Sequence, residues 1–188
     1  MRYQILALAL GFIAVASCSA PTGSGRGSRF EVSFPQSKSA KPLDGRVVLL
    51  LSKDATKEPR KHVAENEMLA SPYMFGMNVE GLAPGQAAVV DDHAFGWPAA
   101  RLADVPAGDY NVQAVLNRYE TFHLADGRTL KLPPDRGEGQ QWATKPGNLY
   151  STPTKLHVDP AHPATFKLAL AQEVPPVADK ADTEFVKH

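Results

Sequence analysis

The fold is decided by residues 102–116, LADVPAGDYNVQAVL, which join a turn to a strand. Pro106 fixes one backbone dihedral angle and Gly108 tolerates a positive φ, so the PAGD segment favours a turn. After the turn, one face of the chain collects the side chains of Tyr110, Val112, Ala114 and Leu116. The other face collects Asn111, Gln113 and Asn117, and Val115 is the only apolar residue that breaks this pattern. Alternation of period two predicts a β-strand with the first face in a core and the second toward solvent.

The rest of the chain supplies further short apolar or alternating runs, separated by turns. We expect strands at residues 29–34, 46–52, 73–79, 86–91, 154–159 and 165–170, and a hairpin that turns at Asp126-Gly127. Sixteen prolines and fourteen glycines argue against long helices. The chain therefore predicts an all-β fold, an antiparallel β-sandwich of immunoglobulin-like or transthyretin-like type with about seven strands and one long irregular loop.

Two other connections are expected to be irregular. Residues 52–67 are rich in charge and predict a surface loop with one helical turn at most. Residues 92–100 contain Phe95 and Trp97, and we expect this aromatic segment to cap the core.

The N-terminal residues predict export from the cytoplasm. Arg2 precedes an apolar run that is too short for a convincing membrane span, as in a signal peptide. The sequence Val15-Ala16-Ser17-Cys18 resembles a bacterial lipobox, in which the cysteine thiol is acylated and becomes the new N-terminus. Cys18 is the only cysteine of the chain, so it cannot form an intramolecular disulfide. We expect a lipoprotein anchored in the bacterial envelope through Cys18; the alternative is an ordinary signal peptide with an incidental cysteine.

The expected organisation has four parts: a signal peptide at 1–17, a flexible tether at 18–28, the β-sandwich at 29–171 and a linker-like tail at 172–188. The tether is rich in glycine and serine, which favours flexibility. Twenty basic and twenty acidic side chains leave no net charge, so the chain lacks the basic footprint of a nucleic-acid-binding protein.

Motifs that carry chemistry are weak. The hydrolase signature G-x-S-x-G is absent. His157, Asp159 and His162 have a spacing that suits a metal ion, and residues 91–93 (DDH) form a similar cluster. Because surface histidines in proline-rich turns are common, we expect neither a metal nor a cofactor.

The long loop between residues 138 and 150 is the best candidate for ligand binding. Trp142 and Tyr150 could stack on an apolar or sugar face. Polar groups that could orient such a ligand come from Glu138, Gln140, Gln141 and Asn148. The alternative is that the loop packs on itself and covers one edge of the sandwich.

Several short motifs together resemble one family. They are DGR at 44–46, LLLSKD at 49–54, EPR at 58–60, FG at 75–76, PAGDY at 106–110, GEGQQW at 137–142 and GNLYS at 147–151. They resemble the N-terminal β-domain of large exported bacterial esterase-like proteins, over about residues 44–188. In that family an α/β-hydrolase domain follows, and its catalytic serine has no counterpart here.

The resemblance implies an accessory module that binds an envelope ligand or an esterase-like α/β-hydrolase domain. The alternative is a fragment or variant of a secreted ester hydrolase whose catalytic domain is separate.

Overall fold

The structure is a computed structural model that describes residues 27–63, 71–136 and 141–177. These ranges hold twelve strands and two single-turn 3₁₀-helices. The strands are β1 (Arg29–Ser33), β2 (Leu43–Ser52), β3 (Tyr73–Leu82), β4 (Ala88–Val90), β5 (Phe95–Trp97), β6 (Gly108–Arg118), β7 (Glu120–His123), β8 (Thr129–Leu132), β9 (Leu149–Tyr150), β10 (Thr154–Val158), β11 (Thr165–Ala169) and β12 (Gln172–Glu173). The 3₁₀-helices are η1 (Pro59–Lys61) and η3 (Leu102–Asp104).

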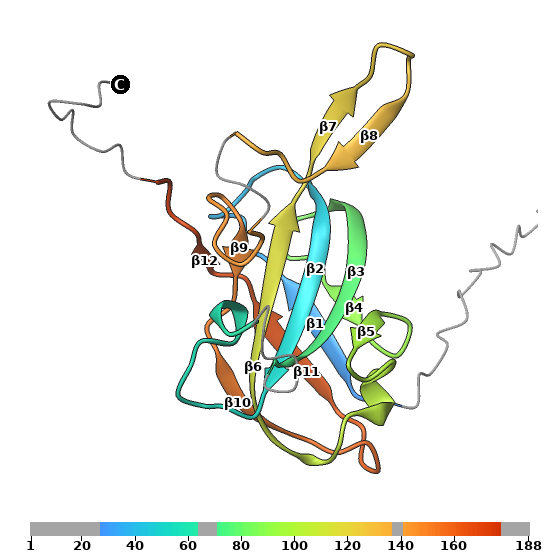
Figure 1. The fold of residues 1–188 in the computed structure, drawn as a ribbon, viewed down its shortest axis with the longest axis vertical. Helices are drawn as coiled ribbons and strands as arrows, with labels where there is room; N and C mark the ends of the chain where they lie inside the picture. Colours follow the sequence, from blue (N-terminus) through green and yellow to red (C-terminus); the bar gives the residue numbers. More distant parts are fainter. Residues whose placement is uncertain (1–26, 64–70, 137–140, 178–188) are drawn as a thin grey trace, which may run out of the picture.

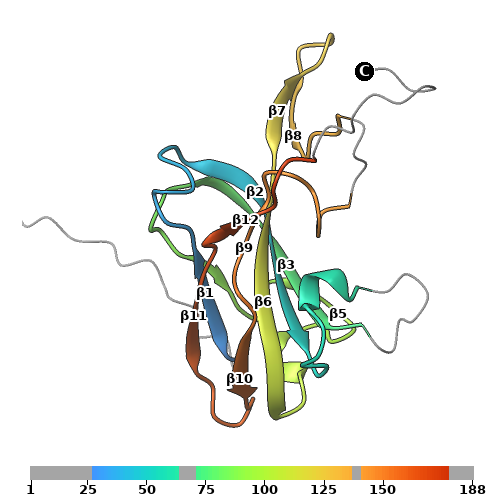
Figure 2. The same ribbon diagram turned by 90° about the vertical axis from the view of Figure 1, so that its left-hand side faces the viewer.

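Two sheets face each other and confirm the predicted β-sandwich (Figures 1 and 2). The small sheet has the order β11-β1-β4. The large sheet has the order β12-β9-β6-β2-β3-β5, and β10 also pairs with β6. Strands β7 and β8 form a separate hairpin that projects from one end of the sandwich (Figure 1).

The core lies between the two sheets, and β6 contributes the face that the sequence predicts. Tyr110, Val112, Ala114 and Leu116 are all buried in it. They pack with Val47, Leu49, Leu51 and Phe75 of the large sheet and with Phe30, Val32 and Leu168 of the small sheet. The Tyr110 hydroxyl donates a hydrogen bond of 2.7 Å to the Pro106 carbonyl and so closes the turn before its own strand.

The second face of β6 corrects the prediction. Gln113 and Val115 are fully buried, whereas Asn111 and Asn117 are partly exposed. Figure 2 shows η1 on this outer side of the large sheet. The loop that holds η1 covers Gln113, because the Arg60 amide donates a hydrogen bond of 2.9 Å to its side-chain oxygen. Local alternation reports which residues share a face, but it cannot report what a distant loop lays over that face.

The remaining elements bear out most of the predicted pattern. The charged connection after β2 contains one helical turn, η1, as expected, and its residues 64–67 lie outside the described residues. The hairpin turns at Asp126-Gly127, where Gly127 has a φ of +83°. Gly108 has a φ of +159°, which is positive as predicted but close to the extended conformation.

Two features of the C-terminal part differ from the prediction. Strand β11 pairs with β1 in parallel, so the small sheet is not wholly antiparallel. The sandwich also continues past residue 171, because β12 pairs with β9 and Val174 is buried.

The predicted signal peptide, Cys18 and most of the tether lie outside the described residues. Within the ranges that are described, no helix is long and apolar enough to span a membrane.

Candidate functional site: an aromatic groove on the outer face of the large sheet

Three hollows formed by the described residues could receive a ligand. Two have charged linings: one of about 220 Å³ at the base of the β7–β8 hairpin, and one of about 320 Å³ between Lys53 and His157. The third, of about 230 Å³, is lined mostly by apolar side chains with two polar ones. Ligand sites in proteins are commonly apolar with a few placed polar groups, so the third hollow is the strongest candidate.

This aromatic groove lies on the outer face of the large sheet. It is lined by Arg46 and Val48 of β2, Met74, Phe75 and Gly76 of β3, Phe95 and Trp97 of β5, Asn117 of β6 and Trp142 of the loop before β9. Both tryptophans of the chain therefore line the same groove.

The alternation of β5 explains why its two aromatic side chains face outward. Gly96 packs against the core: a Cβ built on it would lie 2.5 Å from Cε1 of the buried Phe75 ring. The residues on either side of Gly96 must then point away from the core. Phe95 is 76% exposed and Trp97 is partly exposed. The segment covers the core through Ala94 and Gly96, but its two aromatic rings do not cap the core as expected; they face outward and form one wall of the groove.

Arg46 lies across the sheet surface beside the bare backbone of Gly76. A Cβ built on Gly76 would come within 2.6 Å of Nη2 and 2.8 Å of Nε of Arg46. The absence of a side chain on Gly76 therefore leaves the space that the guanidinium occupies. Nη1 of Arg46 donates a hydrogen bond of 3.0 Å to the side-chain oxygen of Asn78, its cross-strand partner on β3.

The opposite wall, Trp142, stands on a loop that the protein holds by several hydrogen bonds. The side-chain nitrogen of Asn148 donates to the Trp142 carbonyl at 2.8 Å and to the Asn117 side-chain oxygen at 3.0 Å. The Asn148 side-chain oxygen accepts a bond of 3.0 Å from the Arg118 amide. Asn148 is buried, so these bonds fix the loop against the end of β6.

A buried polar cluster beneath the η1 loop fixes the same wall from the other side. Gln113 donates to the Ser151 carbonyl at 2.9 Å and to Glu58 at 3.1 Å. Arg60 bonds the Glu58 carboxylate at 2.6 Å and the Ala143 carbonyl, and its guanidinium lies 4.0 Å from the centre of the Tyr150 ring. Although burial raises the pKa of Glu58, the hydrogen bonds from Gln113, Lys61 and Arg60 lower it more, so Glu58 is charged near neutral pH.

The six residues predicted for binding have four different outcomes in the structure. Glu138 and Gln140 lie outside the described residues, and Gln141 is exposed. Asn148 and Tyr150 instead hold the loop, as the alternative of a self-packed loop predicts. Trp142 lines the groove.

The groove residues that the sequence did not predict for binding include Arg46, Phe95 and Trp97. A signal for the two rings was present, since FGW places two aromatic residues on the same face of any strand. No local signal joins Arg46 to them, because their proximity depends on the order of β2, β3 and β5 in the sheet.

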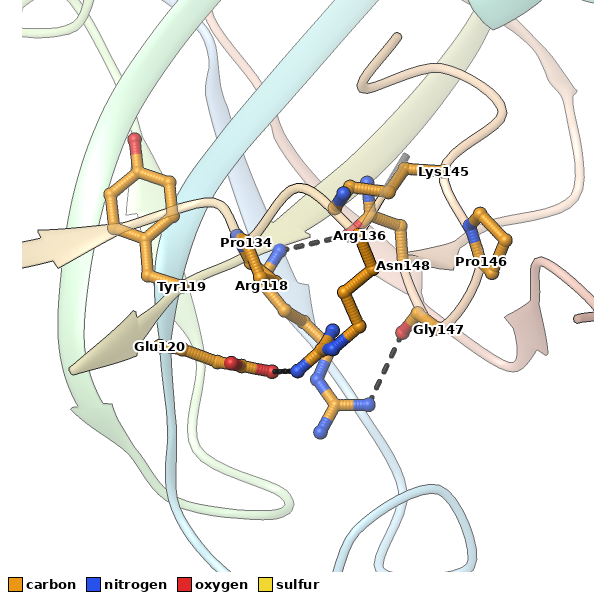
Figure 3. Close-up of a pocket in the computed structure, with 9 residues that line it drawn as sticks. All are labelled: Arg118, Tyr119, Glu120, Pro134, Arg136, Lys145, Pro146, Gly147 and Asn148. Carbon is orange, nitrogen blue, oxygen red and sulfur yellow. Dashed lines mark hydrogen bonds and ion pairs between the residues drawn. The ribbon is translucent and has the colours of Figure 1, made fainter. Parts of the chain in front are cut away.

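The hollow at the base of the β7–β8 hairpin lies between the hairpin and the loop before β9 (Figure 3). Arg136 bonds Glu120 at 2.6 Å, and Nη1 of Arg118 donates to the Gly147 carbonyl at 3.2 Å. Both arginines therefore bond to neighbouring segments of the protein itself.

The predicted metal ligands separate into two pairs. His157 bonds Asp109 at 2.7 Å, and His162 bonds Asp159 at 2.7 Å. His93 similarly bonds Asp91, at 3.0 Å. In the described part of the chain, no group of three or more His, Cys, Asp or Glu side chains is placed to hold a metal ion.

Comparison of the chain with family models, with curated proteins and with solved structures finds no match. The geometry of the groove is therefore the basis for assigning a function.

Proposed function

We propose that this chain is a non-catalytic β-sandwich module that binds a saccharide in the aromatic groove. The observation that carries the proposal is the meeting of three aromatic side chains, Phe95, Trp97 and Trp142, around one hollow of about 230 Å³ on an otherwise ordinary sheet face. Large exposed apolar patches on soluble domains commonly mark binding sites.

The chemistry of the lining suits a sugar ring. Indole and phenyl rings present broad faces with negative potential, on which the weakly positive C–H groups of a pyranose can lie. Asn117 and Arg46 add polar groups beside the rings, where ligand hydroxyls can meet them. The volume is below the roughly 300–1,000 Å³ of pockets that enclose drug-sized ligands, so it suits one sugar ring with the rest of a glycan outside.

The site is also held in place before a ligand arrives. Trp142 is positioned by Asn148, and Phe95 and Trp97 are positioned by a strand that pairs with β3. A preformed site loses little conformational entropy on binding.

We propose further that acylated Cys18 anchors the module in the bacterial envelope, where glycans are abundant ligands. The lipobox-like run and the single cysteine support this anchor. In this proposal the module is an accessory to an esterase-like hydrolase domain, and the motifs that resemble that family support it.

The alternative, catalysis by this chain, finds less support. Each of the three His–Asp pairs has the base and the acid of a catalytic triad, but a triad also needs a nucleophile beside the imidazole. Across the described ranges, no serine hydroxyl is hydrogen-bonded to a histidine ring. The sequence also lacks G-x-S-x-G.

Tryptophan fluorescence tests the proposal, because the only two tryptophans of the chain line the groove. The purified protein is titrated with a panel of neutral and acidic oligosaccharides. We expect a saturable change with at least one of them, and its loss in Phe95→Ala and Trp142→Ala. Phe122→Ala removes a partly exposed aromatic ring on the distant hairpin and serves as the matched control. A panel without any saturable response would overturn the proposal.

A further inference from the structure

We propose that the saccharide is acidic, and that Arg46 binds the carboxylate of a uronic acid unit in the groove. This inference rests on the proposed function, and it names the class of glycan that the same site selects. It is carried by the charge and the hydrogen bonding of one side chain.

Among the described residues that line the groove, only Arg46 is charged. No carboxylate forms an ion pair with it anywhere in the described ranges. By contrast, Arg60, Arg101, Arg128 and Arg136 each pair with an acidic side chain. A groove with one unpaired positive charge favours a ligand with a negative charge.

The hydrogen bonds of Arg46 leave one edge of its guanidinium without an acceptor among the described residues, and this edge lies beside the backbone of Gly76. Its Nη1 is bonded to Asn78. Within the described part of the chain, neither Nε nor Nη2 has a hydrogen-bond acceptor. Nε and Nη2 form one edge of the planar group, and that edge matches the two oxygens of a carboxylate. A carboxylate bound there would form two charge-assisted bonds.

The surroundings place this edge beside the aromatic walls. Gly76, against which the guanidinium lies, pairs with Phe95 on β5, and Arg46 itself pairs with Asn117 on β6. A sugar ring stacked in the groove therefore has the guanidinium beside it. A carboxylate attached to the ring, as in a uronic acid, lies within the reach of such an arrangement, whereas a neutral sugar offers only hydroxyl groups to the same cation.

Gly76 provides a way to test the geometry without removing the charge. Because a Cβ there would overlap Nε and Nη2, Gly76→Ala must displace the guanidinium. The displaced atoms are the far end of a flexible side chain, so the fold is expected to tolerate the change.

The experiment compares acidic oligosaccharides with their own neutral forms. Trisaccharides of galacturonate, mannuronate and glucuronate, each paired with its carboxyl-reduced counterpart of the same linkage, are titrated by calorimetry. We expect at least one acidic member to bind about tenfold or more tightly than its reduced form, the ratio typical of a charge-assisted hydrogen bond. The ratio should fall toward one in Arg46→Met and in Gly76→Ala. Arg128→Met, which removes an exposed arginine at the hairpin tip, should retain it.

The outcomes separate this inference from the proposed function. If reduced and acidic forms bind equally, and both are lost in Trp142→Ala, the groove binds saccharides and the inference about acid selectivity is wrong. An unchanged ratio in Arg46→Met also overturns it. Absence of binding by every member of both series overturns the proposed function and the inference together.

Discussion

Replacing Gln113 with leucine should destabilise the protein strongly, although alternation along β6 places this residue on the face first expected to meet solvent. The side chain is fully buried and forms three hydrogen bonds: to the Arg60 amide, the Ser151 carbonyl and Glu58. Leucine fills a similar volume, so the change isolates the polar contribution.

The magnitude follows from the groups left without partners. The Arg60 amide and the Ser151 carbonyl each lose a buried partner, and an unsatisfied buried group costs about 1–3 kcal/mol. We expect the free energy of unfolding to fall by about 2–6 kcal/mol in total. Asn111→Ala, two residues earlier on the same face but partly exposed, should cost within about 0.5 kcal/mol.

Urea denaturation followed by circular dichroism measures this difference as a lower midpoint with an unchanged slope. A second readout is the Glu58 carboxyl, observed by NMR. Its pKa should rise in Gln113→Leu, because one of the hydrogen bonds that lower it is lost. If Gln113→Leu unfolds at the same urea concentration as the parent protein, the η1 loop does not cover β6 and the reasoning is refuted.

Three further predictions concern the core, β5 and acid stability. In urea titrations, Tyr110→Phe should lower the free energy of unfolding by about 1 kcal/mol, because it loses the hydroxyl hydrogen bond. Tyr110→Ala should lower it by about 3–5 kcal/mol, because it also loses the buried ring. Equal midpoints for both variants would contradict the assignment of Tyr110 to the core. Gly96→Val should lower the melting temperature, because a side chain would overlap the Phe75 ring; a melt like that of the parent would place Gly96 on the outer face. Hydrogen bonds from the Gly81 amide and from Lys131 hold the pKa of Asp44 below its usual value. The parent protein should therefore have a higher free energy of unfolding than Asp44→Asn, with the full difference present above about pH 4–5. This difference should disappear as the pH falls through the lowered pKa of Asp44. A difference that grows as the pH falls would contradict this prediction.

The sequence predicts the core of this fold well because its signals are local. Alternation from Tyr110 to Leu116 identifies the buried face of β6, and Asp126-Gly127 identifies the hairpin turn. Both depend on geometry within a few residues, which a pattern can report.

Features that depend on the order of strands were not predictable in this way. The parallel pairing of β1 with β11 joins segments separated by most of the domain. The cover over Gln113 comes from a loop between β2 and β3. The same limit applies to the groove: Trp142 was predicted as a binding residue, while Arg46, Phe95 and Trp97 reach it only through the arrangement of β2, β3 and β5.

The most direct test of saccharide binding in the aromatic groove is a ¹H–¹⁵N NMR titration of the two indole N–H groups. Trp97 and Trp142 give the only two such signals, and both report on this groove. Titration with the acidic trisaccharides should move both signals along saturable curves that share one dissociation constant. If a trisaccharide binds while both indole signals stay in place, its site lies elsewhere on the protein and the account is contradicted.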